Sequence, residues 1–241
     1  MKDNVNISVC IATYNGELYI KEQLSSILTQ LVENDEVIIS DDSSTDNTVE
    51  IIKSIGDSRI ILFENQKFKS PIYNFENAIK HAKGNFIILC DQDDIWLPNK
   101  IEVMMKNLRQ YDLVVSNCII TDQYLNPIKN SFFPVRFKYL SGFWRNLIKN
   151  NYIGCCMAFN CNMLKYILPF PKGISMHDLW IGLIIKLKGT VYFDRSPLIL
   201  YRRHGSNASQ SGEKSNYTLF FRINYRLKML YKVILRVYFH I

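Results

Sequence analysis

Three aspartates, Asp91, Asp93 and Asp94, follow directly on the apolar run from Phe86 to Cys90. Closely spaced carboxylates repel one another unless a cation neutralises them. Carboxylate oxygens are ligands that Mg²⁺ and Mn²⁺ prefer, and such an ion usually keeps substrate phosphates among its other ligands. This stretch therefore indicates a site for a metal-bound diphosphate. The alternative is an acidic turn that caps a helix beginning near Pro98, because Asp in such loops and Pro in a first helical turn are both common.

The elements that position these aspartates alternate along the chain. The run before Asp91 follows a Lys-Gly-Asn turn and predicts a buried strand. Strands that alternate with helices predict an α/β fold with a mostly parallel central sheet flanked by helices. Three of these strands end in polar, acid-bearing loops that meet at one edge of the sheet, which favours a site over an accidental turn. The other strands are expected over 5–12, 37–40 and 59–63, and the helices over 17–31, 45–55 and 72–82.

The second half of the chain has a different character. Its apolar runs predict strands over 113–121, 190–193 and 198–201, and a helix from 176 to 187. Residues 131–140 are aromatic and irregular, which suits either a loop over a substrate groove or a packed core loop.

Composition and missing motifs exclude several classes of protein. No stretch of 18 apolar residues is free of charge, so we expect no transmembrane helix. The chain runs from Met1 into a strand pattern without a signal-peptide segment, so we expect a cytoplasmic protein. The six cysteines show neither CxxC nor zinc spacing, which argues against a disulfide framework or a structural metal. Neither GxGxxG nor GxxxxGK[ST] occurs, so phosphate must be held through a metal, with a basic residue to help.

The net charge of +7 resides entirely in the C-terminal tail. Residues 1–201 contain 21 Lys and Arg against 21 Asp and Glu, whereas residues 202–241 contain eight basic residues and only Glu213 as an acid. This asymmetry argues against a body that binds nucleic acid and favours a tail that meets an anionic surface.

The tail has the periodicity of an amphipathic helix over 217–240. Its basic residues fall within roughly 160° of a helical wheel, opposite an aromatic and apolar face. This pattern predicts a helix that lies on a membrane surface. The alternative is a terminal helix docked on the domain with a solvated basic face. The basic residues are Arg222, Arg226, Lys228, Lys232, Arg236 and His240, and the apolar ones are Leu219, Phe220, Ile223, Leu227, Leu230, Ile234 and Tyr238.

Two further side chains have candidate chemical roles. Asp178 opens a helix beside Trp180. An apolar setting can raise the pKa of a carboxylate to a value useful in a general base, although an Asp at a helix start is also a common cap. His204 follows Arg202 and Arg203 at a strand end. It is either a surface histidine or a further ligand of the same ion, with one of the arginines near the diphosphate.

Taken together, five motifs in this order resemble those of family 2 glycosyltransferases with the GT-A fold. The Asp-Gln-Asp-Asp-x-Trp, Met-His-Asp and Tyr-Arg-x-His forms look most like the bacterial rhamnosyltransferase branch, which acts in capsule, O-antigen and similar polysaccharide pathways. The matching segments are 8–16, 39–46, 91–100, 176–180 and 201–207.

The resemblance implies a role for each matching residue. Asp178 would be the catalytic base, in a motif where His177 replaces the Glu of many members. Asp93 would be the principal ligand of Mg²⁺ or Mn²⁺, with Asp91 near the ribose or the metal, and His204 would complete the metal shell. Tyr14 would lie near the base. The implied nucleotide-sugar site comprises Thr13, Tyr14, Asn15, Asp41, Asp42, Asp91, Gln92, Asp93, Arg202 and Arg203.

The implied reaction is an inverting displacement. An acceptor hydroxyl, deprotonated by Asp178, would attack the anomeric carbon of a UDP- or dTDP-sugar carrying rhamnose, a hexose or an N-acetylhexosamine. The acceptor would be a lipid-linked saccharide at the inner membrane surface. The expected organisation is a GT-A domain over 1–204, with a nucleotide-binding half (1–110) and an acceptor-binding half (111–204), a mobile linker over 205–216, and a basic helix over 217–241 on the membrane.

Two rival functions differ in what they require. A nucleotidyltransferase would also use strand-end carboxylates and a metal, but it normally has a Gly-rich loop with Arg or Lys after the first strand, and residues 12–16 lack one. A non-catalytic module that binds membranes through the C-terminal helix would leave the ordered acidic motifs unexplained.

Overall fold

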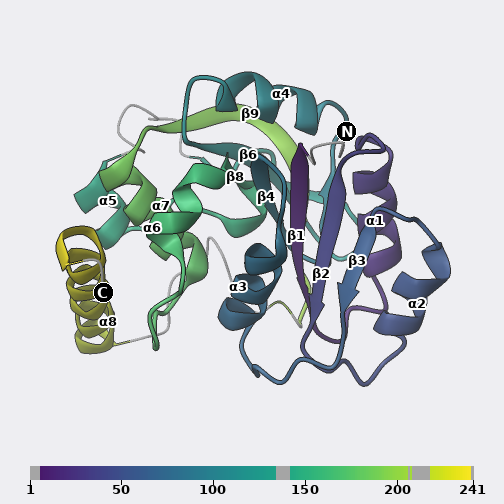
Figure 1. Cartoon of the computed structure of the whole chain (residues 1–241), viewed down its shortest axis with the longest axis horizontal. Helices are drawn as coiled ribbons and strands as arrows, with labels where there is room; N and C mark the ends of the chain where they lie inside the picture. The colour runs from purple at the N-terminus through teal and green to yellow at the C-terminus, as the bar shows by residue number, and fades with distance from the viewer. Residues whose placement is uncertain (1–5, 134–141, 206, 208–217, 240–241) are drawn as a thin grey trace.

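The computed structural model describes residues 6–133, 142–205, 207 and 218–239. Within them one mixed, nine-stranded sheet runs through the molecule and is flanked by helices (Figure 1). Its strand order is β3-β2-β1-β4-β8-β6-β9-β5, with β7 beside β6. The strands are β1 (Ile7–Thr13), β2 (Glu36–Asp41), β3 (Ile60–Phe63), β4 (Phe86–Cys90), β5 (Ile95–Trp96), β6 (Leu113–Thr121), β7 (Pro127–Lys129), β8 (Met157–Asn160) and β9 (Val191–Arg202).

The N-terminal half is the predicted parallel part of the sheet. Strands β3, β2, β1 and β4 pair in parallel, and every residue of β2 is buried. Near-continuous apolar runs form such strands because helices cover both faces of a parallel sheet. The intervening helices are α1 (Ile20–Leu28), α2 (Thr48–Ile55) and α3 (Pro71–His81). As a result, the carboxyl ends of β1, β2 and β4 lie together at one edge.

The C-terminal half mixes strand directions. Strand β8 is antiparallel to both β4 and β6, whereas β6 and β9 are parallel. The two strands predicted over 190–193 and 198–201 are one long strand, β9. Its register against β6 shifts around Asn117, whose side chain donates to the Arg195 carbonyl (3.2 Å) and so bridges the polar middle of β9. The helices here are α4 (Lys100–Leu108), α5 (Phe143–Ile148), α6 (Leu164–Ile167) and α7 (His177–Lys188), with short 3₁₀ turns at Gly154–Cys156 and Cys161–Met163.

Two predicted segments fall mainly outside the described residues. Of the aromatic stretch 131–140, the structure describes 131–133, where Phe133 is buried with its ring 5.6 Å from that of Phe193. The beginning of this stretch is therefore part of the core. Of the linker predicted over 205–216, only Gly205 and Asn207 are described.

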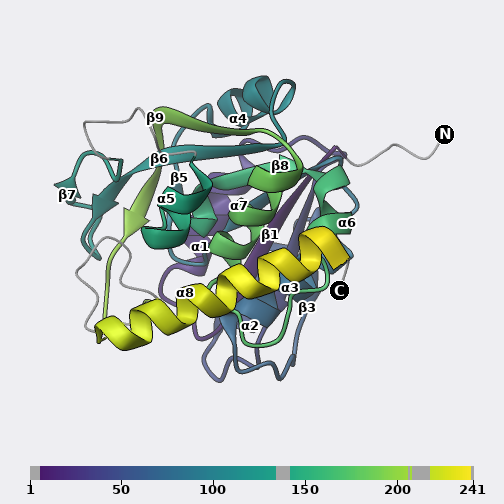
Figure 2. The ribbon, with the colours of Figure 1, turned by 90° about the vertical axis from the view of Figure 1, so that its left-hand side faces the viewer.

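The C-terminal helix α8 (Leu219–Ile234), extended by a π-helical turn over Leu235–Phe239, lies along one side of the molecule and contacts α5 and α7 (Figure 2). It docks through buried Met229, Val233 and Val237 and through two arginines of the predicted basic face. Arg226 donates to the Leu147 carbonyl (3.1 Å), and Arg236 to three carbonyls of residues 166–169. The helix is thus docked on the domain, as in the alternative considered from the sequence, but its basic face is only partly solvated.

None of the helices in the described part of the chain is long and apolar enough to cross a lipid bilayer. The six cysteines are free thiols, and five of them are buried.

Candidate active site

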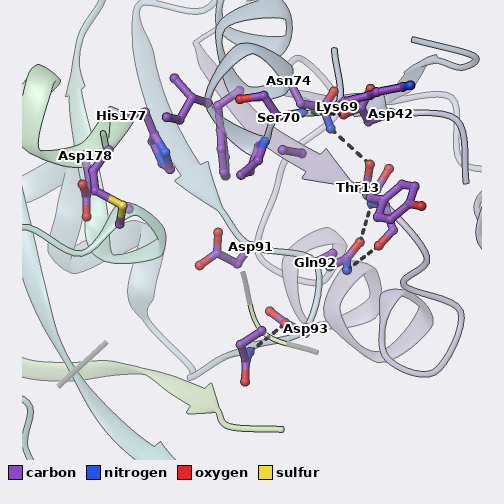
Figure 3. A pocket seen from close by; sticks show the side chains of 18 of the residues that line it. Thr13, Asp42, Lys69, Ser70, Asn74, Asp91, Gln92, Asp93, His177 and Asp178 are labelled. Atoms are coloured by element: carbon purple, nitrogen blue, oxygen red, sulfur yellow. Dashed lines mark hydrogen bonds between the residues drawn. The ribbon is translucent and has the colours of Figure 1, made fainter. Parts of the chain in front are cut away.

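A cavity of about 1030 Å³ opens at the edge where β1, β2 and β4 end (Figure 3). Its lining comes from seven parts of the chain: the end of β1, the loop after β2, the segment from Lys67 into α3, the loop after β4, the turn at Ile153 and Gly154, the start of α7, and the end of β9 with the segment that follows it. Asp178 and Thr13 lie on opposite sides of the cavity with Asp91 between them (Figure 3). A site of this volume suits a ligand of nucleotide-sugar size.

Gln92 joins the ends of β1 and β4 at the floor of the cavity. Its side chain accepts from the Tyr14 amide (2.9 Å) and donates to the Tyr14 carbonyl (3.1 Å). A Cβ atom at Gly16 would lie 2.5 Å from the Gln92 Oε1 atom, so the glycine provides the space that this clamp needs. Tyr14 is 57% exposed and lines the cavity, which leaves its ring accessible to a planar base. Thr13 and Gln92, two of the predicted nucleotide-sugar ligands, also line the cavity.

Asp41 is buried, whereas Asn15 is exposed, and both bond to residues of the loops around the cavity. Asp41 is 1% exposed, and its carboxylate accepts from the hydroxyls of Thr13 and Ser44. Asn15 adopts a left-handed backbone (φ 49°), and its side chain accepts from the Thr45 amide (2.8 Å). Neither is among the residues that line the cavity. Both predicted ligands instead shape the loops that carry the lining residues.

Asp42 lines the cavity, and it also organises a part of the wall that the sequence motifs did not reveal. Its carboxylate accepts from the backbone amides of Phe68 (2.6 Å) and Ser70 (3.0 Å). These bonds hold the segment between β3 and α3 at the cavity, where it contributes Lys67 and Lys69. The only sequence signal for these lysines is that they follow a parallel strand, whose end must reach the same sheet edge.

Asp93 lies at the centre of a polar cluster. Its Oδ2 atom is 2.8 Å from His204 Nε2 and accepts from the Asn207 side chain (3.0 Å). The ring of Tyr19 lies 4.6 Å from the His204 ring and forms part of the same cluster. The segment after β9 therefore brings His204 and Asn207 to Asp93, the predicted metal ligand. Asn207 also lines the cavity and was not predicted as a site residue.

The neighbouring acids form a second group. One ligand atom each of Asp91, Asp94 and Cys155 lie within 4.8 Å of one another. Asp94 accepts from the Arg202 amide through Oδ1 (3.0 Å), while its buried Oδ2 has no hydrogen-bond partner. Burial, followed by the charges of Asp93 and Asp178, raises the pKa of Asp91 to about 7, and burial and the same kind of repulsion raise the pKa of Asp94. An unpartnered oxygen among repelling carboxylates fits a hard divalent cation such as Mg²⁺ or Mn²⁺.

Arg202 has a different place from the predicted one beside the diphosphate. It is 4% exposed, and its guanidinium donates to the carbonyls of Asp93 (2.9 Å) and Gln123 (3.1 Å) and to the carboxylate of Glu22 (2.7 Å). The residues that line the cavity include neither Arg202 nor Arg203. Arg202 thus supports the backbone of the acidic loop, and the basic groups at the cavity itself are lysines.

Replacing Arg202 by Met should lower the free energy of unfolding by about 1–3 kcal/mol, because the buried carbonyl of Asp93 loses its donor and the carbonyl of Gln123 loses one too. Urea unfolding measures the change, with Arg109→Met, an exposed arginine at the end of α4, as the matched control. If the variant is as stable as wild type but no longer binds nucleotide, Arg202 contacts the diphosphate and does not support the acidic loop.

Asp178 lies in the first turn of α7 and is 5% exposed. Burial raises its pKa to about 7, against the opposing effect of hydrogen bonds from the Leu179 amide and the Asn150 side chain (3.3 Å). The neighbouring His177 stacks on Phe75 (4.2 Å between ring centroids), and burial lowers its pKa to about 4, so this imidazole is neutral at pH 7. Asp178 therefore has the proton affinity of a general base that works near neutral pH.

The rate of any reaction that uses Asp178 as a base should fall below about pH 7, approaching tenfold per pH unit, because only the ionised carboxylate accepts a proton. The same raised pKa destabilises the folded protein as the pH rises from about 4 to about 7, since the unfolded chain ionises this group at its ordinary pKa. A kcat–pH profile at saturating donor and metal tests the first expectation. A flat profile from pH 5 to 8 would contradict it.

The fold places a cavity lined by carboxylates at the carboxyl ends of parallel strands, which is where α/β enzymes bind their ligands. Residues 8–168 match the family described as Glycosyl transferase family 2, and the chain belongs to this family. The predicted family is thereby confirmed.

Two bacterial relatives are similar over most of the chain. One is the UDP-Glc:alpha-D-GlcNAc-diphosphoundecaprenol beta-1,3-glucosyltransferase WfgD of Escherichia coli, 33% identical over 193 residues, which are 76% of this chain and 71% of that protein. Another is the dTDP-rhamnosyl transferase RfbG of Shigella flexneri, 30% identical over 82% of this chain and 72% of that protein.

Solved structures confirm the predicted GT-A fold. S. aureus TarS 1-349 in complex with UDP-GlcNAc superposes with a TM-score of 0.67 at 16% identity, over 96% of this chain and 73% of that one. The mannosyltransferase PcManGT from Pyrobaculum calidifontis, in complex with GDP-Man and Mn²⁺, gives a TM-score of 0.61 at 19% identity, over 86% of this chain and 58% of that one. The chain thus spans less than two thirds of the second structure.

Proposed function

We propose that this glycosyltransferase moves a sugar, with inversion, from a UDP- or dTDP-sugar to a hydroxyl of a lipid-linked saccharide during the synthesis of a cell-surface polysaccharide. The observation that carries the proposal is the position of Asp178, which lines the same cavity as Asp91 and Asp93 and has a pKa of about 7. A base and a diphosphate-binding cluster at one cavity are the two parts that a single displacement requires.

In the proposed reaction Asp178 takes the proton of the acceptor hydroxyl. The acceptor oxygen then forms a bond to the anomeric carbon as the bond from that carbon to the diphosphate oxygen breaks. Asp93, His204 and Asp91 would hold Mg²⁺ or Mn²⁺, which when bound would supply positive charge to the leaving diphosphate. Lys67 and Lys69 would add further positive charge at the cavity.

The relatives support the choice of substrates. Their names specify UDP-glucose or a dTDP-rhamnosyl donor, and WfgD acts on a saccharide linked to diphosphoundecaprenol. Such an acceptor stays in a membrane, so we propose that this chain works in the cytoplasm at the surface of the inner membrane. Membership of the glycosyltransferase family argues against both a nucleotidyltransferase and a purely membrane-binding module.

A transfer assay with a small panel of donors tests this function. The full chain is incubated with radiolabelled UDP-glucose, UDP-GlcNAc or dTDP-rhamnose, a GlcNAc-diphosphate-lipid acceptor, and Mn²⁺ or Mg²⁺. We expect label in the lipid product with at least one donor, and none with EDTA. Formation of a nucleotide-sugar from a sugar 1-phosphate and a nucleoside triphosphate, without any transfer to lipid, would contradict the proposal.

A further inference from the structure

Helix α8 and the π-helical turn that follows it present several large apolar side chains to solvent. Six of them recur every three or four residues, which places them in one line along the helix. At 1.5 Å of rise per residue this line is roughly 27 Å long. We call it the outer stripe; it comprises Phe220 (81% exposed), Ile223 (48%), Leu227 (59%), Tyr231 (62%), Ile234 (40%) and Tyr238 (72%). Exposed apolar patches of this size usually mark an interaction site.

The inward side of α8 fixes the direction in which the outer stripe points. Met229 and Val233 are almost fully buried against the domain. Arg236 is 9% exposed; its guanidinium lies 5.4 Å from the Trp180 ring and donates to the carbonyls of Leu168 (2.9 Å) and Pro169 (2.7 Å). Turning the helix to bury the outer stripe would leave these carbonyls without donors and would expose the buried face. The outward orientation is therefore built into the packing.

The charge around the outer stripe indicates what it meets. Residues 218–239 include five Lys and Arg and no Asp or Glu. The adjacent α5 has the same character: Trp144 and Ile148 are each 64% exposed, Arg145 and Lys149 are exposed, and the helix has no acid. Aromatic and aliphatic side chains with only positive charge between them suit an anionic lipid interface. Two copies of this face would repel each other, which disfavours a second copy as the occupant.

We propose that the face formed by α5 and α8 binds an anionic lipid bilayer, with the outer stripe inserted at the level of the lipid headgroups. The inference rests on the proposed function for its purpose, because a lipid-linked acceptor would then be presented to an enzyme already held at the membrane. The structure adds one feature to the sequence prediction of a helix on a membrane surface: Arg226 and Arg236 bond to the domain, so these two residues of the basic face are not available to the lipid.

The same helix also supports a wall of the cavity. Arg236 and Lys232 donate to carbonyls of Pro169 and Lys172 in the segment that leads from α6 to α7. This segment ends at Ser175 and Met176, which line the cavity next to the candidate base. Binding through the outer stripe would therefore hold this side of the cavity at the bilayer, where the hydroxyl of a lipid-linked acceptor arrives.

Vesicle flotation with the full chain tests the proposal. Vesicles of phosphatidylcholine with phosphatidylglycerol are compared with vesicles of phosphatidylcholine alone, for wild type and for Leu227→Glu/Tyr231→Glu. We expect wild type to bind the anionic vesicles, and the variant to bind about tenfold or more weakly because two large apolar side chains no longer leave water. The matched control is Val32→Glu/Ile128→Glu, which places the same charges at exposed apolar positions away from α5 and α8 and should bind like wild type.

Three results would overturn the proposal: no binding of wild type to anionic vesicles, equal binding to both kinds of vesicle, or equal binding by wild type and the stripe variant. Sedimentation of wild type as a dimer that the stripe variant dissolves, without vesicle binding, would assign the face to a second copy. Sugar transfer to a short-chain acceptor in solution does not require membrane binding. The stripe variant should therefore retain this activity, which separates the inference from the proposed function. Vesicle binding by a chain that transfers no sugar to any acceptor would support the membrane inference and contradict the proposed function.

Discussion

Replacing Asp178 by Asn should lower kcat for sugar transfer by about 10²–10⁴-fold, the usual contribution of a general base. Asn has nearly the shape of Asp but cannot accept the proton of an acceptor hydroxyl. The affinity for nucleotide should change little, because the carboxylates of Asp91 and Asp93 remain. Initial rates at saturating donor and acceptor measure the effect, and calorimetric titration with UDP or dTDP in Mn²⁺ measures the affinity.

Glu50→Gln is the matched control for this variant, because it removes one negative charge at an exposed position on α2. It should leave both kcat and affinity as in wild type. At pH 8 the Asp178→Asn protein should be at least as stable as wild type, since it no longer buries a carboxylate whose pKa is about 7. A rate within a few-fold of wild type would mean that another group takes the proton.

Replacing Asp93 by Ala should weaken Mn²⁺-dependent nucleotide binding by about 100-fold or more, since even loss of a group that only orients a metal ligand costs about 10–100-fold. Asp93 Oδ2 is the atom at which His204 and Asn207 meet. Titration of free Mn²⁺ by electron paramagnetic resonance, in the presence of UDP or dTDP, measures the loss.

Glu50→Ala serves as the control for the Asp93 variant and should bind Mn²⁺ and nucleotide like wild type. Asp94→Asn is an informative comparison, because Asp94 lies beside Asp91 and Cys155 rather than beside His204. If Asp93→Ala binds Mn²⁺ like wild type and Asp94→Asn binds it much more weakly, the metal site is the second group of ligands and not the cluster around Asp93.

The fold was predictable where the chain has long, regular patterns. The runs that became β1, β2 and β4 are apolar enough to be strands buried on both faces, and the helices between them have clear helical spacing. The two-residue strand β5 and the short helix α5 are too brief to show a period. Strand β9 appeared as two strands because its polar middle resembles a turn, and only the bridge from Asn117 shows that it continues.

The site was predictable where acids follow strong strands, as at Asp91 and Asp93. Lys67 and Lys69 have no such signal, since their place depends on the backbone bonds that Asp42 makes. Arg202 shows the converse difficulty: a basic residue at a strand end can face a ligand or turn back to the protein, and the sequence pattern is the same. The same holds for the arginines of α8, because periodicity assigns Arg226 and Arg236 to one face without showing that this face bonds to carbonyls of the domain.

Thermal unfolding of the full chain with UDP or dTDP, each with and without Mn²⁺, tests the central claim most directly. A nucleotide present at about 100 times its dissociation constant adds roughly 2.7 kcal/mol to the stability of the folded state. We predict a rise in Tm that requires both Mn²⁺ and one of the nucleotides and is abolished by EDTA. No rise with either nucleotide, or an equal rise without the metal, would contradict a cavity built for a metal-bound nucleoside diphosphate.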